Sequence, residues 1–388
     1  MDTPIRIGMI GIGQQGLNHL RVLWKMQDEG LAKIVALCDM SEENLSESKI
    51  RRYVQGFEGN ALRTYTDADR MLREQEMDAL YVAIPPGCHN GEIVRAAQSG
   101  IHVFAEKPMS LYLDEAMEMD RAIQKAGVLS TVGFQSRYDP RHEAARAFLT
   151  DKRMVMVTVV SNGSLEGHSV KHTPTEQMGG PRNRVWAANI EWSGSTVVEA
   201  GIHQVDLMRS WCGDVEWVQG TYVHRDPEDI QDGGDNPYGY TVAFGFEGGA
   251  VGNLIITRLR RVYSGDGYQS ILWDHGQLRF EGDGLVAYYY EGPYPPSERP
   301  PMEAIRHPIA VESGISSVEA INRAFVEAVI TEDPGKVKST FHSSMNSLAA
   351  VLAANASDQL RGERIYLDQF MGSPRYERFR QKPPGSAS

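Results

Sequence analysis

The sequence predicts an α/β Rossmann domain with a doubly wound parallel sheet, followed by an α+β domain with a large, mostly antiparallel open sheet. Strand and helix patterns alternate through residues 1–134 of the 388-residue chain, the order expected of parallel strands joined by helices. Over residues 135–372, apolar strand patterns follow one another without intervening helices, which indicates antiparallel hairpins. Residues 373–388 are predicted to form a polar C-terminal tail.

A glycine-rich turn joins the first predicted strand, 5–10, to the first predicted helix, 17–26. Gly11 permits a tight turn, Gly13 lets the backbone approach a phosphate, and Gly16 allows close packing of the helix. The free N–H groups at a helix start also favour an anion. We therefore expect the pyrophosphate of a dinucleotide to be bound by Gly11, Ile12, Gly13, Gln14, Gln15 and Gly16.

Asp39 follows the second predicted strand, 33–37. The number of residues between Gly16 and Asp39 is close to the interval between the glycine turn and the acid that holds the adenosine ribose in such folds. A carboxylate accepts hydrogen bonds from ribose hydroxyls and repels a 2′-phosphate, so Asp39 predicts NAD rather than NADP. Alternatively, Asp39 is a turn residue that caps a helix over 41–49.

The remaining elements of the first domain bring further candidates to the carboxyl edge of the sheet, where ligands bind. Pro85 and Pro86 end a strand there and are predicted to flank the nicotinamide. His89 either caps the next helix or contacts the cofactor. The predicted elements are strands 79–84, 101–105 and 129–134 and helices 90–99 and 113–126.

In the second domain, residues 240–246 alternate between apolar and small or polar side chains, which implies one covered sheet face. The other face is predicted to pair subunits, as a homodimer or homotetramer. The predicted helices are 140–149, 317–331 and 339–359, and the predicted strands are 155–160, 215–223, 240–246, 251–257, 268–273 and 277–281.

Charge and composition narrow the class of protein. A formal net charge of −12 argues against nucleic-acid and anionic-membrane partners. The start shows no leader pattern, so we expect a cytoplasmic protein with three reduced cysteines, Cys38, Cys88 and Cys212.

No metal is expected: although His168, His172 and Glu176 recur at four-residue intervals, the glycines and prolines around them favour a loop.

Three further motifs follow the glycine turn in fixed order. They are Ala105-Glu106-Lys107-Pro108, then Gly-Phe-Gln-x-Arg-Tyr-x-Pro over 133–140, then Glu-x-Gly-x-His-x-x-Asp over 199–206. With the Pro-Pro loop, this order resembles the Gfo/Idh/MocA family, named for glucose-fructose oxidoreductase and inositol dehydrogenase, over nearly the whole chain. The resemblance implies an NAD(P)-dependent dehydrogenase acting on a CH–OH group of a sugar, cyclitol or sugar derivative. It also implies a cis Lys107–Pro108 peptide bond.

Lys107 is the first catalytic candidate. At the end of a parallel strand its ammonium can hold the reacting oxygen, where negative charge collects as hydride leaves the carbon. His203 is the candidate acid/base, because an imidazole can accept the hydroxyl proton near neutral pH. Glu106 is expected to orient this turn, and both Glu106 and Lys107 are expected to contact the cofactor.

Glu199 stands where the family usually has aspartate. It precedes His203 by four positions on a helix predicted over 196–211, so both would face one side. Glu199 could orient His203 or bind substrate hydroxyls. The pattern from Thr196 to Glu199 is also a capping box, which would turn the carboxylate back to the helix start.

Other residues are expected to bind substrate, and each has a structural alternative. Asp206 either contacts His203 or substrate or is a buried structural acid, and the segment 181–186 either lines the pocket or is an interdomain loop. Arg258, Arg260 and Arg261 could form a subunit-interface patch. The predicted substrate-binding residues are Arg137, Tyr138, Arg184, Trp186 and Asp206.

Two other functions remain open. One is a redox-neutral, NAD-retaining enzyme of the glycosidase or lyase type, and the other is a non-catalytic regulator that senses nucleotide or sugar. The presence of Lys107 and His203 argues against the regulator.

Overall fold

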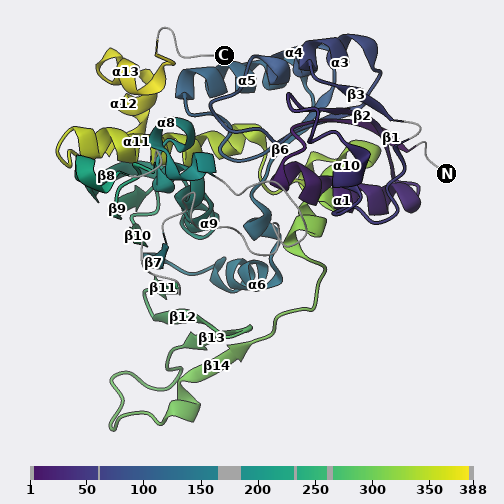
Figure 1. Ribbon diagram of the computed structural model, residues 1–388. Helices are drawn as coiled ribbons and strands as arrows, with labels where there is room; N and C mark the ends of the chain where they lie inside the picture. The colour runs from purple at the N-terminus through teal and green to yellow at the C-terminus, as the bar shows by residue number, and fades with distance from the viewer. Residues whose placement is uncertain (1–3, 60–61, 165–184, 231–233, 260–264, 384–388) are drawn as a thin grey trace.

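The computed structural model describes the chain except residues 1–3, 60–61, 165–184, 231–233, 260–264 and 384–388. Its described part contains a six-stranded and a nine-stranded sheet (Figure 1). The six strands are all parallel, and the second sheet is mostly antiparallel, so the predicted fold class is confirmed.

The six-stranded sheet has the order β3-β2-β1-β4-β5-β6. Most predicted elements are present with ends shifted by up to three residues, while β3 and α3 were not predicted. The strands are β1 (Ile5–Ile10), β2 (Ala32–Cys38), β3 (Arg63–Tyr65), β4 (Ala79–Val82), β5 (His102–Ala105) and β6 (Ser130–Val132). The helices are α1 (Gln14–Asp28), α2 (Glu47–Ile50), α3 (Ala68–Glu74), α4 (Glu92–Gln98) and α5 (Leu113–Ala126).

The helix expected over 41–49 is wrong: turns occupy its first part, and only α2 follows. The Oδ1 of Asp39 accepts a hydrogen bond from the amide of Ser41 (2.9 Å), which stabilises the turn at the start of this segment.

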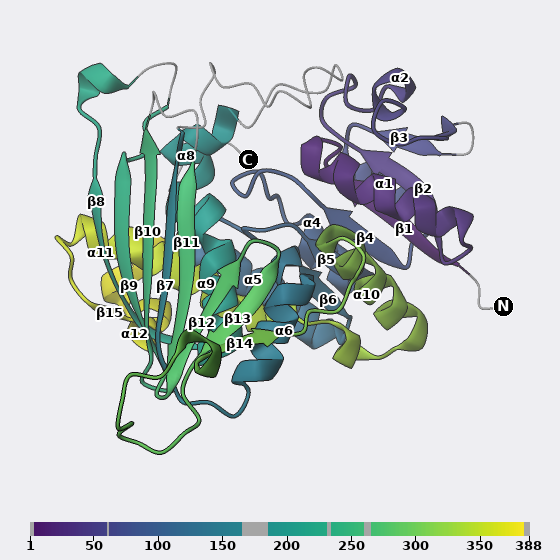
Figure 2. The same cartoon turned by 90° about the horizontal axis from the view of Figure 1, so that it is seen from below.

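One face of the parallel sheet is covered by α1 and by α10 (Ser317–Thr331), which lie side by side (Figure 2). Ile321, Phe325 and Val326 of α10 share a buried apolar cluster with α1 and the strands. Helix α10 comes from the part of the chain that the sequence assigned to the second domain, so that part completes the first sheet's core. On the other face, α4 and α5 belong to a second apolar cluster.

The nine-stranded sheet has the order β14-β13-β12-β11-β7-β10-β9-β8-β15. Among the strand pairs of its described residues, β7 and β10 run parallel and the others antiparallel. The strands are β7 (Met154–Ser164), β8 (Val215–Val223), β9 (Gly239–Phe246), β10 (Val251–Leu259), β11 (Asp266–Trp273), β12 (Gly276–Glu281), β13 (Gly284–Tyr288), β14 (Arg306–Ile309) and β15 (Ile365–Tyr366).

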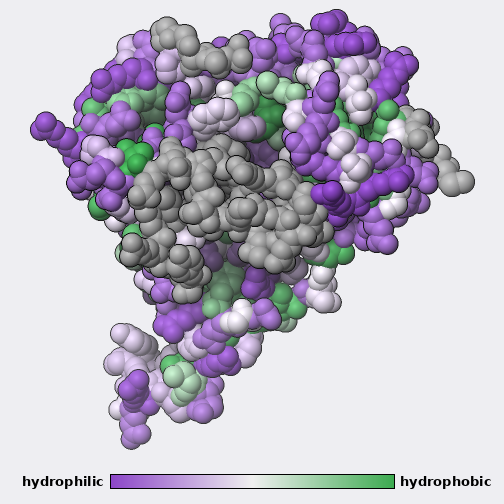
Figure 3. All heavy atoms as spheres, viewed as in Figure 1, coloured by the Kyte–Doolittle hydropathy of each residue, from purple (hydrophilic) through white to green (hydrophobic). Residues whose placement is uncertain are grey.

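Helices cover one face of this sheet, mainly through α9 and α11. The segment between β13 and β14 projects from the body of the molecule, with Tyr294 92% exposed (Figures 1 and 3). Residues 374–380, assigned to a polar tail from the sequence, are packed: Tyr376 is buried, and Arg380 donates to Asp114. The helices are α6 (Pro140–Leu149), α8 (Ile190–Ser193), α9 (Ile202–Cys212), α11 (Phe341–Gln359), α12 (Leu367–Gly372) and α13 (Glu377–Arg380).

The continuous helix predicted over 196–211 is interrupted. A π-helical segment, Val197–Gly201, precedes α9. Within it, the carbonyl oxygen of Glu199 accepts a hydrogen bond from Lys107. In a regular α-helix this oxygen would accept from the backbone amide four residues later. None of the helices in the described residues is both long and apolar enough to cross a bilayer.

Candidate active site

The candidate site lies at the carboxyl edge of the parallel sheet. Residues just after three strands extend the backbone hydrogen bonding of the sheet there. The backbone amides of Ala83, Glu106 and Gly133 donate to the carbonyl oxygens of Ile10, Val82 and Ala105, respectively. This alignment places the glycine turn, the Pro-Pro loop and the Lys107 turn along one edge, where ligands bind in such sheets.

The glycine turn has the geometry that a dinucleotide requires. Gly11 has φ +89°, and a Cβ there would lie 2.3 Å from the carbonyl oxygen of Ala83. A Cβ on Gly16 would lie 1.9 Å from the carbonyl oxygen of Gly11. At Gly13 a Cβ would meet nothing within 4 Å. Gly11 and Gly16 are therefore required by the fold, whereas Gly13 borders open space at the start of α1, where a phosphate fits.

Asp39 lies against the glycine turn. Its Oδ2 accepts a hydrogen bond from the amide of Ile12 (2.7 Å), and its Oδ1 accepts from Ser41 and from the side chain of Asn44. Asp39 thus orients two turns at once, and the helix over 41–49 that it would alternatively cap is absent. Its contact with a ribose stays a prediction.

The other proposed cofactor contacts have local roles in the structure. Pro85 accepts a hydrogen bond from the amide of Cys88 and closes the turn after β4. Next to it, Pro86 is buried. His89 is buried and bonded to Glu92. Burial would raise the pKa of Glu92, but the hydrogen bond and charge of His89 outweigh it and lower that pKa. His89 does not cap α4, whose N-cap is Gly91 without a side-chain cap bond, and contact of His89 with the cofactor stays a prediction.

Lys107 and Glu199 form a buried ion pair. The Lys107–Pro108 peptide bond is cis, as the family resemblance implies. The Nζ of Lys107 donates to the carbonyl oxygen of Glu199 (2.8 Å) and to its Oε1 (3.0 Å). The two side chains are 6% and 5% exposed. Removing either partner would leave a buried charge uncompensated.

This pair overturns the capping-box interpretation of Glu199. The Oγ of Ser195 accepts the bond from the amide of Val198, and Thr196 makes no side-chain cap bond. The carboxylate of Glu199 instead faces Lys107, which comes from the other sheet. Glu199 is therefore placed to set the position of the lysine ammonium.

His203 lies in the first turn of α9, with its ring 6.1 Å from that of Phe134 in an edge-on arrangement. Phe134 follows β6, so His203 faces the same edge as Lys107. Burial would raise the pKa of Glu106, but the His19 hydrogen bond and the charges of His19, Lys107 and His203 together lower it. Lys107 and His203 thus both lie within electrostatic range of Glu106.

Arg137 and Asp206 pair with one another. Nε and Nη2 of Arg137 donate to the two carboxylate oxygens of Asp206 at 2.6 and 2.9 Å. Asp206 also accepts from Ser347 and is 1% exposed, as a buried structural acid is. Tyr138 is buried, and its hydroxyl accepts from the amide of Lys338 (2.9 Å). Substrate contact by these residues stays a prediction.

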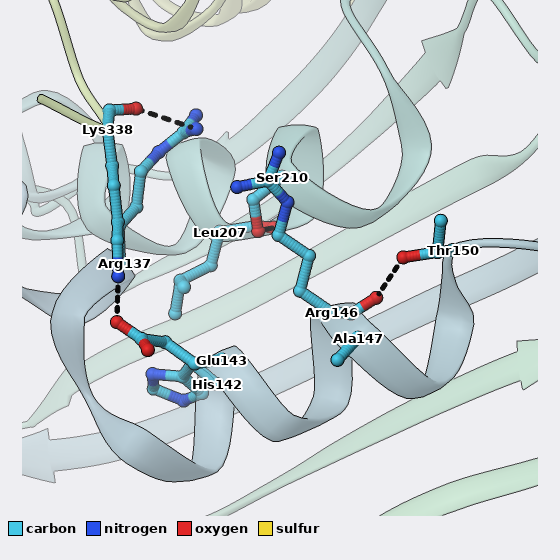
Figure 4. A pocket seen from close by; sticks show the side chains of 9 residues that line it. All are labelled: Arg137, His142, Glu143, Arg146, Ala147, Thr150, Leu207, Ser210 and Lys338. Carbon is cyan, nitrogen blue, oxygen red and sulfur yellow. Dashed lines mark hydrogen bonds and ion pairs between the residues drawn. The ribbon is translucent and has the colours of Figure 1, made fainter. Parts of the chain in front are cut away.

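Arg137 also borders a hollow of about 320 Å³ between α6 and α9 (Figure 4). Figure 4 shows the side chain of Arg146 reaching toward Ser210, while the guanidinium of Arg137 donates to the carbonyl oxygen of Lys338. The described residues that line the hollow include neither Lys107 nor His203, so it is separate from the candidate active site. They are Arg137, His142, Glu143, Arg146, Ala147, Thr150, Leu207, Ser210 and Lys338.

Several predicted positions fall outside what the structure describes. Arg184 lies outside the described residues, and Trp186 is described only as part of a short 3₁₀ helix, Val185–Ala188. Within the described ranges, no three acidic, histidine or cysteine side chains could together hold a metal ion. Also outside the described residues are His168, His172, Glu176, Arg260 and Arg261. The three cysteines are free thiols, and burial raises the pKa of Cys38 to about 12.

Two side chains that were not predicted from the sequence are linked to the Lys107 turn through Glu106. His19 of α1 and Asn322 of α10 form a buried hydrogen-bonded chain to Glu106. His19 could have been suspected, because it lies three residues beyond Gly16 on the inner face of the first helix. Nothing in the sequence places Asn322 beside it.

Comparisons with known proteins agree with this fold. Residues 5–134 match the oxidoreductase family, NAD-binding Rossmann fold, of the Gfo/Idh/MocA type, and residues 164–279 match a Gfo/Idh/MocA C-terminal domain. The chain is 27% identical over 276 residues to myo-inositol 2-dehydrogenase of Thermotoga maritima, covering 71% of this chain and 74% of that one. It is 23% identical over 378 residues to inositol 2-dehydrogenase/D-chiro-inositol 3-dehydrogenase of Lacticaseibacillus casei, covering 96% and 97%.

Solved structures show the same fold. Myo-inositol 2-dehydrogenase from Lactobacillus plantarum superposes with a TM-score of 0.68 at 20% identity, covering 94% of this chain and 99% of that one. The WlbA dehydrogenase from Bordetella pertussis, solved with NADH and UDP-GlcNAcA, gives 0.69 at 22% identity, covering 94% and 98%.

Proposed function

Since the chain belongs to the Gfo/Idh/MocA family of NAD-binding oxidoreductases, we propose that it is an NAD-dependent dehydrogenase of a sugar, cyclitol or sugar derivative. Hydride would move between the nicotinamide and a ring hydroxyl or ketone. The observation that carries the proposal is the buried Lys107–Glu199 pair at the sheet edge that His203 also faces. The inositol dehydrogenases among the relatives favour a cyclitol or a similar polyol ring.

The residues around the glycine turn fit NAD. Gly13 and the start of α1 would hold the pyrophosphate, and Asp39 would face the adenosine ribose and repel a 2′-phosphate. When bound, NAD supplies the hydride acceptor. Glu106 and the loop of Pro85 and Pro86 would border its nicotinamide end.

Lys107 would hold the reacting oxygen of the substrate. An ammonium has three N–H donors, and the two bonds to Glu199 use two of them. The third makes no hydrogen bond within the part of the chain that the structure describes, and it would bind the substrate oxygen, where a fixed cation stabilises developing negative charge. Glu199 keeps the ammonium in place before substrate arrives, and His203 would take the hydroxyl proton during oxidation.

The test is NADH formation, followed by absorbance, with NAD or NADP and a panel of inositols, aldoses, sugar acids and glycosides. We expect turnover with NAD, and a loss of kcat of about 100-fold or more in Lys107→Ala. Lys125→Ala, on the exposed end of α5, is the matched control and should retain activity. Unchanged kcat in Lys107→Ala would contradict the assignment. Tight NAD binding without NADH release would favour the NAD-retaining reaction or the sensor.

We also propose that the uncovered face of the nine-stranded sheet pairs subunits. At the centre of this face, across β8, β9, β10, β7 and β11, two rows of cross-strand neighbours carry no charged side chain, in a chain whose formal net charge is −12. Such a face fits a second copy of itself in a homodimer or homotetramer. One row is Thr221, Thr241, Ile255, Val160 and Tyr268, and the next is Gln219, Ala243, Asn253, Thr158 and Ser270.

A cytoplasmic location is part of the same proposal. The free thiols Cys38, Cys88 and Cys212 support it, because thiols persist in a reducing compartment.

A further inference from the structure

We propose that His19 and Asn322 are positioning residues that act on Lys107 through Glu106. This inference rests on the role proposed above for Lys107 and adds a group of residues outside the three motifs. The hydrogen-bonded chain runs from Asn322 on α10 to His19 on α1, then to Glu106 after β5, and ends at the backbone amide of Lys107.

The contacts are short and buried. The Nδ2 of Asn322 lies 3.0 Å from Nδ1 of His19, the Nε2 of His19 lies 2.7 Å from Oε1 of Glu106, and the Oε2 of Glu106 accepts from the amide of Lys107 at 3.0 Å. Asn322, His19 and Glu106 are 0%, 4% and 7% exposed. Water therefore offers little replacement for a lost partner, and each loss leaves a buried polar group unsatisfied.

The hydrogen bonds also show which atom donates and which accepts along the hydrogen-bonded chain. Nδ2 of Asn322 donates to the carbonyl oxygen of Val318 (2.7 Å), which identifies it as the amide nitrogen. The Glu106 carboxylate only accepts, so Nε2 of His19 carries a proton and donates it to Glu106. Nδ1 of His19 lies 3.0 Å from Nδ2 and 3.3 Å from Oδ1 of Asn322. The Asn322 amide can therefore donate to Nδ1 of a neutral ring and accept from Nδ1 of a charged one, and in both cases it holds the ring that holds the carboxylate.

Glu106 transmits this restraint to the catalytic turn. A Cβ on Gly133 would lie 2.5 Å from Oε1 of Glu106, so the carboxylate is packed directly on the backbone after β6. It cannot move toward β6, and His19 and the Lys107 amide hold its two oxygens. The turn that aims the Lys107 ammonium is thereby fixed before substrate binds, as electrostatic stabilisation of a transition state requires.

The outer surface of the α1–α10 contact holds Asn322 in place. Lys25 pairs with Glu319 (2.8 Å), and Arg323 pairs with both oxygens of Glu29 (2.7 Å each). These ion pairs lie on either side of Asn322 in sequence, so α10 is attached to α1 around the buried chain. The C-terminal part of the molecule thereby contributes a side chain to the organisation of the first sheet's active edge.

The experiment compares Asn322→Leu and His19→Leu with two other variants. One is His19→Gln, and the other is Val326→Ala, which changes a buried residue of α10 that takes no part in the hydrogen-bonded chain. Gln can place an amide N–H where Nε2 of His19 lies. We expect both leucine variants to lower kcat tenfold or more, with KM for NAD changed less than threefold. His19→Gln should recover most of kcat, and Val326→Ala should keep kcat within twofold despite its lower melting temperature.

Hydrogen exchange of the Lys107 amide, measured by mass spectrometry without substrate, separates this inference from the proposed reaction. Asn322→Leu should speed that exchange tenfold or more, and Val326→Ala should not. If no substrate is turned over, the reaction assignment fails and the exchange result alone decides the positioning role. Unchanged exchange in Asn322→Leu, or kcat that falls equally in Val326→Ala, would overturn the proposal.

Discussion

Gly13 and Gly133 are both glycines at the active edge, and the structure gives them opposite reasons to lack a side chain. A Cβ on Gly13 meets nothing within 4 Å, and its φ of −76° suits any residue. A Cβ on Gly133 meets the Glu106 carboxylate. The first glycine therefore serves a ligand, and the second serves the fold of the site.

Gly13→Ala should leave stability unchanged and weaken NAD binding. The added methyl has space in the protein but occupies the position where the pyrophosphate approaches the backbone. We expect the melting temperature to stay within a degree or two and the Kd for NAD to rise tenfold or more, measured by calorimetry. Equal affinity in both proteins would place the phosphates elsewhere.

Gly133→Ala should cost about 1–3 kcal/mol of unfolding free energy, because the methyl overlaps a carboxylate whose two oxygens are held. Urea unfolding measures the loss. Gly372→Ala is the matched control: it meets nothing within 4 Å and should be nearly neutral. A neutral Gly133→Ala would mean that Glu106 can move.

Acidification should destabilise the protein in part by protonating the buried carboxylate of Glu106. The bond from His19 and the nearby charges hold its pKa below the usual 4.5 despite burial. A carboxyl with a lowered folded-state pKa contributes stability above pH 4.5 that is lost as pH falls through the folded value. Glu106→Gln should therefore be less stable at pH 7 and lose less on acidification from pH 5 to pH 3, in melting-temperature scans. Curves parallel to those of wild type would contradict this, and exposed Glu118→Gln is the control.

The candidate residues differ in how visible they are in the sequence. Lys107 and His203 belong to motifs with fixed spacing, so they could be named before the structure. Asn322 and His19 are 303 positions apart, and each resembles an ordinary helix residue. Their pairing depends on how α10 docks on α1, which local pattern cannot specify. Likewise, the bond of Glu199 to Lys107 could not be distinguished from a helix cap.

At the level of elements, strong periodicity gave accurate boundaries. The predicted α5, α6, β8 and α10 match the observed ends because each is a long apolar pattern with clear stops. Short or exposed elements carry no such signal, as the three residues of β3 show. The π-helical segment was also missed, and its Glu199 carbonyl oxygen bonds to Lys107, a tertiary contact that local sequence does not reveal.

The docking of α10 on α1 should depend measurably on Arg323. Its guanidinium binds Glu29 and Glu319, and it is 21% exposed, so partial solvation limits its contribution. We expect Arg323→Ala to lower the unfolding free energy by about 1 kcal/mol. Urea titration checks this, and exposed Arg73→Ala on α3 should change it far less. A loss that does not shrink in high salt would indicate packing rather than charge.

At the level of the whole molecule, the uncharged centre of the uncovered sheet face predicts assembly. Ile255 lies in the middle of a row that crosses β8, β9, β10, β7 and β11. Ile255→Asp should shift the protein toward monomer, because two copies of the face would then bring carboxylates together. Light scattering after size-exclusion chromatography measures the mass. Gln98→Asp, exposed on α4, should leave the mass unchanged, and an unaltered mass in Ile255→Asp would locate the interface elsewhere.

The position of α10 also has a consequence for the order in which the protein forms during synthesis. The strands and helices of the parallel sheet are complete by residue 134, but the helix that closes one of its faces ends at Thr331. At about 5–20 residues per second, a ribosome needs roughly 10–40 s to make the intervening chain. During that interval Tyr81 and Phe104, which contact Phe325 in the finished protein, lack their cover. One face of the nascent sheet therefore stays uncovered until α10 has been made, and the Lys107 turn acquires its full support only after that point.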